Sequence, residues 1–108
     1  MTRSLPSTLL DTHGFLLDRH AWTPAIAEVF AQDEGIQLSE AHWEILHLLR
    51  AYYEEFDASP ANRALVKYVK VARGPEKGRS IYLLGLFPGS PARVGSRIAG
   101  LPKPKNCL

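Results

Sequence analysis

Residues 39–70 read SEAHWEILHLLRAYYEEFDASPANRALVKYVK, and the spacing of their apolar residues decides the fold. Apolar side chains recur every three or four positions as far as Phe56, which is the period of an amphipathic helix. Ser39 directly precedes this pattern and is a suitable N-cap. A second helical pattern begins after Ser59-Pro60, so we expect two helices joined by a short turn. The stripe expected to be buried on the first of them consists of Ala41, Ile45, Leu48, Leu49, Tyr52 and Phe56.

Two further pairs of a hydroxyl residue and a proline predict helix starts elsewhere in the chain. Thr23-Pro24 and Ser90-Pro91 repeat the arrangement of Ser59-Pro60, in which a hydroxyl is suited to the N-cap and a proline to the first helical turn. We therefore expect a helix over about residues 22–34, which Gly35 would end, and a last short helix from Pro91 that stops at Gly100.

Two segments remain outside these helices. The run RSIYLLGLF at residues 79–87 fits a strand or a short helix equally well, because apolar runs of this length are ambiguous. The run LLDTHGFLLD at residues 9–18 places two apolar pairs around Gly14 and predicts a small β-hairpin. The fold class expected is mainly α, with a minor N-terminal hairpin in a single domain over residues 1–100.

Length and composition are those of an ordinary globular domain. The 108 residues suffice for one modest core, and 45% are apolar and 22% charged. No apolar run approaches the ~20 residues of a membrane span, and no stretch near the N-terminus is typical of a signal peptide. The single cysteine excludes an internal disulfide, which fits a reducing compartment, so we expect the protein in the cytoplasm.

The net charge of +2 is the sum of an acidic first half and a basic second half of the chain. Residues 1–62 hold three basic and ten acidic residues, whereas residues 63–108 hold ten basic residues and Glu76 alone. Two interpretations stay open. The halves differ only in their solvated surfaces, or the second half builds a basic face that meets an acidic partner or a nucleic acid.

The two helices of the opening stretch also resemble a helix-turn-helix. Arg63, Lys67 and Lys70 would then lie near one face of the second helix and contact phosphates, as in a DNA-binding regulator. Small helical domains pack helices in this way without DNA, and few side chains here suit base reading. We prefer the purely structural interpretation.

The last eight residues, 101–108, read LPKPKNCL and are a candidate reactive segment. Pro102 and Pro104 lack an N–H group and keep the preceding residues out of the α region, so the segment is expected to be an extended, partly stiffened arm. The seven residues from Gly100 to Cys107 would reach roughly 20 Å at ~3.3 Å per residue. Such an arm could carry the thiol of Cys107 into a deep pocket of a partner.

Cys107 is a candidate for three roles: covalent carrier, metal ligand and enzyme nucleophile. A metal site lacks a second cysteine, and the histidines show no convincing ligand spacing. A self-contained nucleophile needs a rigid geometry that a mobile arm does not provide. A covalent carrier is favoured, with no cofactor and no metal. The histidines are His13, His20, His42 and His47.

Three stretches of the chain resemble the TusE/DsrC family of sulfur-relay proteins: EGIQLS, HWEILHLLRAYYEEFDASPANRALVK and LFPGSPARVGSRIAGLPKPKNCL. The resemblance covers nearly the whole chain and is most specific in the ending with its penultimate cysteine. It implies a compact orthogonal helical bundle with a small N-terminal β element and a mobile C-terminal arm. It also implies that Cys107 carries sulfur as a persulfide.

One departure separates the branches of this family. DsrC proteins have a second cysteine eleven positions before the penultimate one, where this chain has Ser96. The chain therefore resembles the TusE-like branch. That resemblance implies a monomeric sulfurtransferase without a membrane partner, which accepts sulfur from a TusBCD complex. It would pass the sulfur to the thiouridylase MnmA for 2-thiolation of the tRNA wobble uridine, reaching tRNA only indirectly. A single-cysteine DsrC relative in sulfite-reductase-linked metabolism is the other reading within the family.

Several basic residues match basic positions of the family and are candidates for contact with acidic partner surfaces or tRNA, although solvated charge explains them equally well. The aromatic side chains Trp43, Tyr52, Tyr82 and Phe87 are expected in the core rather than in a site. The candidate partner-binding residues are Arg63, Lys67, Lys77, Lys103 and Lys105.

Overall fold

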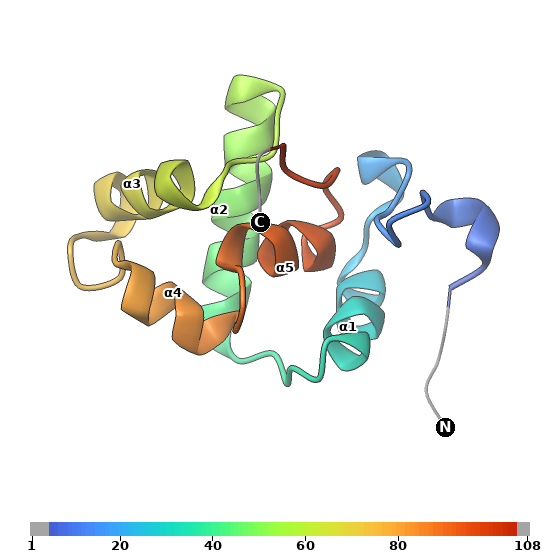
Figure 1. Cartoon of the computed structure of the whole chain (residues 1–108), viewed down its shortest axis with the longest axis horizontal. Coiled ribbons are helices and arrows are strands. Elements are labelled where there is room, and N and C mark those ends of the chain that lie inside the picture. The colour runs from blue at the N-terminus through green and yellow to red at the C-terminus, as the bar shows by residue number, and fades with distance from the viewer. Residues whose placement is uncertain (1–4, 106–108) are drawn as a thin grey trace.

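The computed structural model describes residues 5–105, which fold as short helices arranged around a central one (Figure 1). The last helix, α5, packs against α1, α2, α3 and α4, and so forms the centre of the bundle. This confirms the expected mainly helical fold class. The elements are the 3₁₀ turns η1 (Ser7–Leu9) and η2 (Arg19–Ala21), followed by α1 (Pro24–Asp33), α2 (Glu40–Phe56), α3 (Asn62–Arg73), α4 (Ser80–Leu86) and α5 (Pro91–Ile98).

Two of the three expected hydroxyl–proline helix starts are confirmed. The hydroxyl of Thr23 accepts from the backbone N–H of Ile26 at the start of α1, and that of Ser90 accepts from the N–H of Arg93 at the start of α5. The third helix, α3, does begin after Ser59-Pro60, at Asn62, but its N-cap is Ala61. The capping role expected of Ser59 is wrong, because its hydroxyl donates to a distant carbonyl instead. The ambiguous run at residues 79–87 contains the helix α4.

The small N-terminal β-hairpin expected around Gly14 is wrong for the described residues. Only an isolated antiparallel bridge joins Leu10 to Leu16. Gly14 does occupy the turn, with a φ of 83°, and the Asp11 carboxylate accepts from two backbone N–H groups within it. Phe15 and Leu16 are both buried. Adjacent residues of a strand face opposite sides, so both sides of this segment are covered by the rest of the protein. The segment therefore does not extend a β-ladder.

The face of α5 explains why this helix is central. Its buried residues include Val94 and Ile98, and Gly95 lies so close to Leu49 of α2 that an added Cβ would stand 2.9 Å from that side chain. Phe87, expected in the core, is fully buried beside them. The small residues of α5 therefore allow the other helices to approach it closely.

The buried stripe of α2 is confirmed at Ile45, Leu48 and Leu49 but is wrong at Phe56, which is 52% exposed. Phe56 is the last residue of a 17-residue helix, and its ring packs against Tyr52 at a centroid distance of 4.5 Å. The end of α2 extends beyond the helices that cover its middle (Figure 1). Among residues 5–105 no helix is both long and apolar enough to cross a membrane.

Candidate functional site

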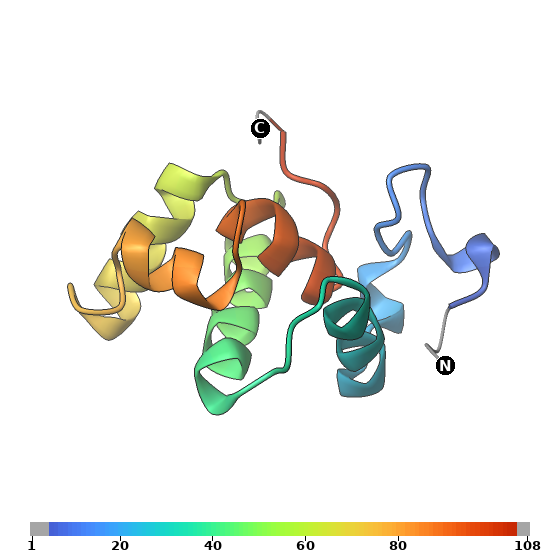
Figure 2. The ribbon, with the colours of Figure 1, turned by 60° about the horizontal axis from the view of Figure 1, so that its bottom comes forward.

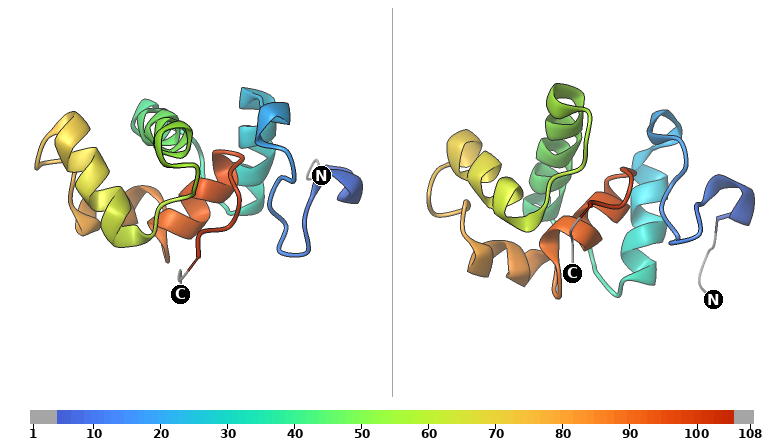
Figure 3. Two further views of the ribbon diagram at one scale, coloured as in Figure 1. Left: turned by 90° about the horizontal axis from the view of Figure 1, so that it is seen from above. Right: turned by 45° about the horizontal axis from the view of Figure 1, so that its top comes forward.

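The chemistry predicted from the sequence is at the C-terminal arm, and the structure describes the root of that arm. The arm leaves the end of α5 and runs beside the connection between α2 and α3 (Figures 2 and 3). The candidate nucleophile Cys107 lies outside the described residues, so its surroundings carry no part of the argument. The structure shows how residues 98–105 are held against the rest of the protein.

The end of α5 is closed by a Schellman motif, in which the two residues after the C-cap bond back to the last turn. The N–H of Gly100 donates to the carbonyl of Arg97 at 3.1 Å, and the N–H of Leu101 donates to the carbonyl of Ser96 at 2.9 Å. Gly100 has a φ of 76°, which favours glycine. The predicted stop at Gly100 is therefore confirmed, and it turns the chain sharply out of the helix.

Two side chains from distant parts of the chain hold the last carbonyls of α5. The indole Nε1 of Trp22 donates to the carbonyl of Ile98 at 2.9 Å, and Nη1 of Arg50 donates to that of Ala99 at 2.8 Å. The Arg50 guanidinium also lies over the Trp22 ring, 4.4 Å from its centroid. Burial, followed by repulsion from Arg19, lowers the pKa of Arg50 below its ordinary value. A cation at a helix C-terminus is also favoured by the helix dipole.

The first residues of the arm lie against the body of the protein. Leu101 is 1% exposed and belongs to the core, and Pro104 is also buried. The hydroxyl of Ser59, in the loop between α2 and α3, donates to the carbonyl of Pro102 at 2.6 Å. Lys103 and Lys105 are exposed. The described arm thus alternates between groups that contact the body and cations that face solvent.

The structure does not bring all the predicted basic residues to this root. Lys77 pairs with Glu44 at 2.8 Å, and Arg73 binds the other oxygen of the same carboxylate. Glu44 lies twelve residues before Phe56 on α2, about 18 Å along the axis at 1.5 Å per residue, so this pair sits far from the loop that touches the arm. Lys77 is therefore engaged within the fold.

Arg63 and Lys67 are the predicted cations on α3. Both are exposed, and in the described part of the chain neither forms an ion pair. Arg63 lies in the first turn of α3, four residues after Ser59, so it is close in sequence to the arm contact. Lys67 instead lines a groove of about 510 Å³ between α2 and α3, together with Phe56 and Val71.

Ser96, which the family resemblance aligns with the second cysteine of DsrC proteins, is fully buried in α5. Its hydroxyl has no hydrogen-bond partner among the described residues, while its carbonyl accepts the bond from Leu101. The side chain at position 96 therefore belongs to the packed interior directly beneath the arm.

His42 has a structural role that sequence analysis did not identify. Its Nδ1 accepts from the N–H of Ser39 at the start of α2, and its Nε2 lies 2.8 Å from the carbonyl of Leu86 in α4. These partners assign the proton to Nε2. Within residues 5–105 no three His, Cys, Asp or Glu side chains are grouped as a metal site would require.

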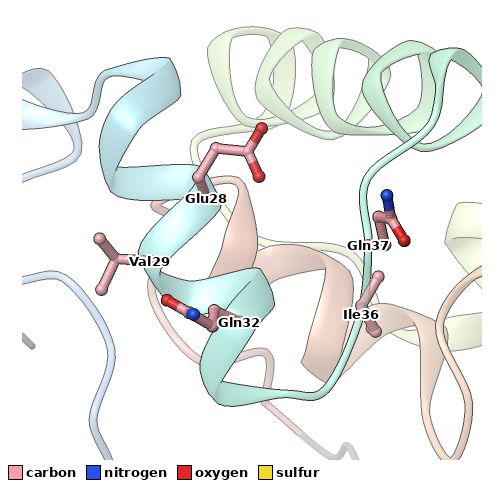
Figure 4. Close-up of a pocket in the computed structure, with 5 residues that line it drawn as sticks. All are labelled: Glu28, Val29, Gln32, Ile36 and Gln37. Atoms are coloured by element: carbon pink, nitrogen blue, oxygen red, sulfur yellow. The ribbon is translucent and has the colours of Figure 1, made fainter. Parts of the chain in front are cut away.

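A separate hollow is lined by α1 and by the connection that follows it (Figure 4). It has a volume of about 350 Å³, and its lining carries one carboxylate and two amides but no nucleophile. None of the candidate residues of the sequence analysis contributes to it. Its lining residues are Glu28, Val29, Gln32, Ile36 and Gln37.

The residues that fix the arm root were missed from the sequence because their contacts span long distances along the chain. Ser59 acts 43 residues from Pro102, Arg50 acts 49 residues from Ala99, and Trp22 acts 76 residues from Ile98. A local pattern carries no signal for such pairs. The one local clue was Gly100, which marked where the arm begins.

Comparison with known proteins identifies relatives over nearly the full length. The sequence model of one family, described as DsrC like protein, matches residues 6–108. Sulfurtransferase TusE of Pectobacterium atrosepticum is 50% identical over 98 residues, which cover 91% of this chain and 90% of that protein. Sulfurtransferase TusE of Escherichia coli is 48% identical over 98 residues, with coverages of 91% and 90%. The NMR structure of Allochromatium vinosum DsrC has a TM-score of 0.82 at 45% identity and covers 92% of this chain and 88% of its own.

Proposed function

The chain belongs to the DsrC-like protein family and is a sulfurtransferase, and we propose that it relays sulfur as a persulfide on Cys107. The observation that carries this proposal is the position of the single cysteine in the sequence, seven residues after Gly100, where the chain leaves an α5 end that is held by Trp22 and Arg50. A thiol so placed can visit two partners in turn while the body of the protein stays unchanged.

The transfer needs only thiol chemistry. The Cys107 thiolate attacks the terminal sulfur of a donor persulfide, the S–S bond of the donor breaks, and the donor cysteine leaves as a thiolate. Cys107 then holds the persulfide, and a thiolate of the acceptor attacks its terminal sulfur in the same way. No net oxidation occurs in either step. A free thiol has a pKa near ~8.5, so a partner pocket is the place where the thiolate becomes favoured.

We assign the donor to a TusBCD-like complex and the acceptor to an MnmA-like tRNA thiouridylase. The sulfur then reaches the wobble uridine of tRNA, which this protein contacts only through the acceptor. The protein acts as a monomer in the cytoplasm, without a membrane partner. Support comes from the relatives named TusE and from Ser96 in place of a second cysteine. A helix-turn-helix regulator and a single-cysteine DsrC relative in sulfite-reductase-linked metabolism are not favoured by these relatives.

Intact mass spectrometry tests the carrier directly. After incubation with a persulfide donor, the wild-type protein is expected to gain the mass of one sulfur atom, and Cys107→Ser is expected to gain none. The variant should keep the circular dichroism and melting temperature of the wild type, because the described core is built by side chains of residues 5–101. Continued sulfur relay to tRNA by the folded Cys107→Ser variant would end the carrier proposal.

A further inference from the structure

We propose that Ser59 is a positioning residue for sulfur transfer, because its hydroxyl sets the direction in which the arm leaves the body. The proposal rests on the relay through Cys107 described above. Ser59 touches neither the sulfur nor any described reacting group. It acts through the backbone of Pro102, whose carbonyl accepts its hydrogen bond at 2.6 Å.

The hydroxyl of Ser59 is presented from a stiff loop. Pro60 follows it directly and is buried, and a residue that precedes proline is restricted to extended backbone. The loop joins the end of α2 at Phe56 to the start of α3 at Asn62, so both of its ends are fixed by helices. The donor therefore has a defined place on the surface before the arm reaches it.

The bond to Ser59 is the one that the arm can lose without disturbing the core. Upstream, the carbonyls of Ile98 and Ala99 are held by the part-buried bonds from Trp22 and Arg50. In the described part of the chain, the Ser59 bond is the only hydrogen bond made by residues 102–105, and it is exposed to solvent. The α5 end is thus fixed, whereas the path of the following residues depends on this bond, which competes with water, and on the burial of Pro104 against the body.

The two prolines of the arm help the Ser59 bond to direct it. Neither Pro102 nor Pro104 has an N–H group to offer a neighbouring segment, and their rings limit the backbone rotation between the bond and the thiol. Cys107 lies three residues beyond Pro104, which is about 10 Å of extended chain. Fixing the carbonyl of Pro102 therefore restricts the volume that the thiol samples.

An arm already directed toward its working position loses less conformational freedom when a protein partner binds it. A typical hydrogen bond of this kind changes a population by about five-fold. We therefore expect loss of the Ser59 hydroxyl to slow transfer to and from protein partners by about five-fold. Transfer from a small molecule, which reaches the thiol from any direction, should be unaffected.

The first experiment measures the position of the arm without using sulfur chemistry. The single cysteine allows a nitroxide to be attached at Cys107 of the full-length protein, and paramagnetic broadening of the backbone amide signals maps where it lies. Wild type should give a confined pattern that spreads and weakens in Ser59→Ala. Ser59→Thr, which keeps the hydroxyl, should restore the wild-type pattern, and Ser7→Ala, at an exposed serine of η1, should leave it unchanged. Identical patterns in wild type and Ser59→Ala would overturn the proposal.

The second experiment separates positioning from stability. Persulfide loading of Cys107 is timed by mass spectrometry with glutathione persulfide and, separately, with a persulfide-loaded TusBCD complex. Ser59→Ala should load from the complex about five-fold more slowly, keep the wild-type rate with glutathione persulfide, and recover in Ser59→Thr. Equal slowing with both donors, or an unchanged or faster rate with the complex, contradicts the proposal. If wild type takes no sulfur from either donor, the relay itself fails, and the nitroxide pattern still decides whether Ser59 directs the arm.

Discussion

Gly100 shows how a single residue determines where a chemically active segment begins. Its φ of 76° is costly for a residue with a Cβ, and an added Cβ would stand 2.3 Å from Cδ1 of the Trp22 ring. The same ring donates the hydrogen bond to the carbonyl of Ile98. A side chain at position 100 would therefore strain the backbone and displace the indole that holds the end of α5.

We expect Gly100→Ala to lower the free energy of unfolding by at least 1–2 kcal/mol, the approximate cost of the left-handed backbone alone. Urea denaturation followed by circular dichroism measures this change. Gly85→Ala is the matched control, because Gly85 lies in α4 with a negative φ and no atom lies within 4 Å of its added Cβ. The control should be neutral or stabilising, since alanine favours helix. If Gly100→Ala were as stable as the wild type, a side chain at position 100 would not strain the backbone or displace the Trp22 indole.

At the scale of the elements, Glu44 ties α2 to the end of α3 and to the loop that follows it. Its carboxylate binds Lys77 through one oxygen and Arg73 through the other, both at 2.8 Å. The hydrogen bond from Lys77 is the largest cause that lowers the pKa of Glu44, burial opposes it, and Arg73 adds to the lowering. The charged carboxylate is therefore more stable in the folded protein than in the unfolded chain.

The sign of the resulting pH dependence follows from this lowered pKa. The stabilisation is complete above the unfolded pKa of about 4.5 and is lost as the pH falls through the lower folded pKa. We expect Glu44→Gln to be less stable than wild type at pH 7, and the difference to shrink as the pH falls below about 4.5. Unfolding in urea at several pH values measures it. Glu76→Gln, at an exposed loop residue, should show no such convergence.

The helices could be predicted from the sequence to the extent that their signals are local. The hydroxyls of Thr23 and Ser90 bond to N–H groups three residues away, so the sequence pattern alone located those starts. Ser59 carries the same dipeptide signal, but its hydroxyl is used by Pro102, 43 residues away. The hairpin failed for a related reason, because tertiary packing buries both Phe15 and Leu16. The residues that hold the arm root could not be predicted, because their partners lie 43 to 76 residues away, and the role of Cys107 stays a prediction.

At the scale of the whole molecule, the division of charge along the chain is partly neutralised by folding. Arg97 of the basic half binds Asp33 and Glu34 of the acidic half, each at 2.6 Å, and also donates to the carbonyl of Gly14. Burial opposes the charge on Arg97, but the hydrogen bonds that its guanidinium donates to Glu34 and Asp33 outweigh burial and raise the pKa of Arg97. These pairs join the two halves, so Arg97 is engaged within the fold and is not available to a basic face.

The cations left facing solvent near the arm have a different use. Lys103 and Lys105 flank the buried Pro104 and are exposed, with no ion pair in the part of the chain that the structure describes. A persulfide on Cys107 is more acidic than its thiol and is anionic at neutral pH. Both lysines therefore accompany a negative charge on the arm and remain available to carboxylates of a partner.

Long-range attraction of this kind acts on association rates and is screened by salt. We expect Lys103→Glu with Lys105→Glu to slow sulfur transfer between protein partners at low ionic strength, chiefly through slower association. Raising the salt to about 1 M, where the Debye length is about 3 Å, should bring the variant and wild type together. Stopped-flow mixing with the loaded donor complex at several salt concentrations measures both effects.

The control variant is Lys70→Glu with Arg79→Glu, which changes the net charge equally at exposed positions of α3 and of the residue before α4. If the charges act at the arm, this control should transfer sulfur nearly as fast as wild type at low salt. Equal slowing in both double variants would mean that the net charge of the whole molecule steers association. Unchanged low-salt rates in the arm variant would mean that Lys103 and Lys105 serve only as solvated spacers.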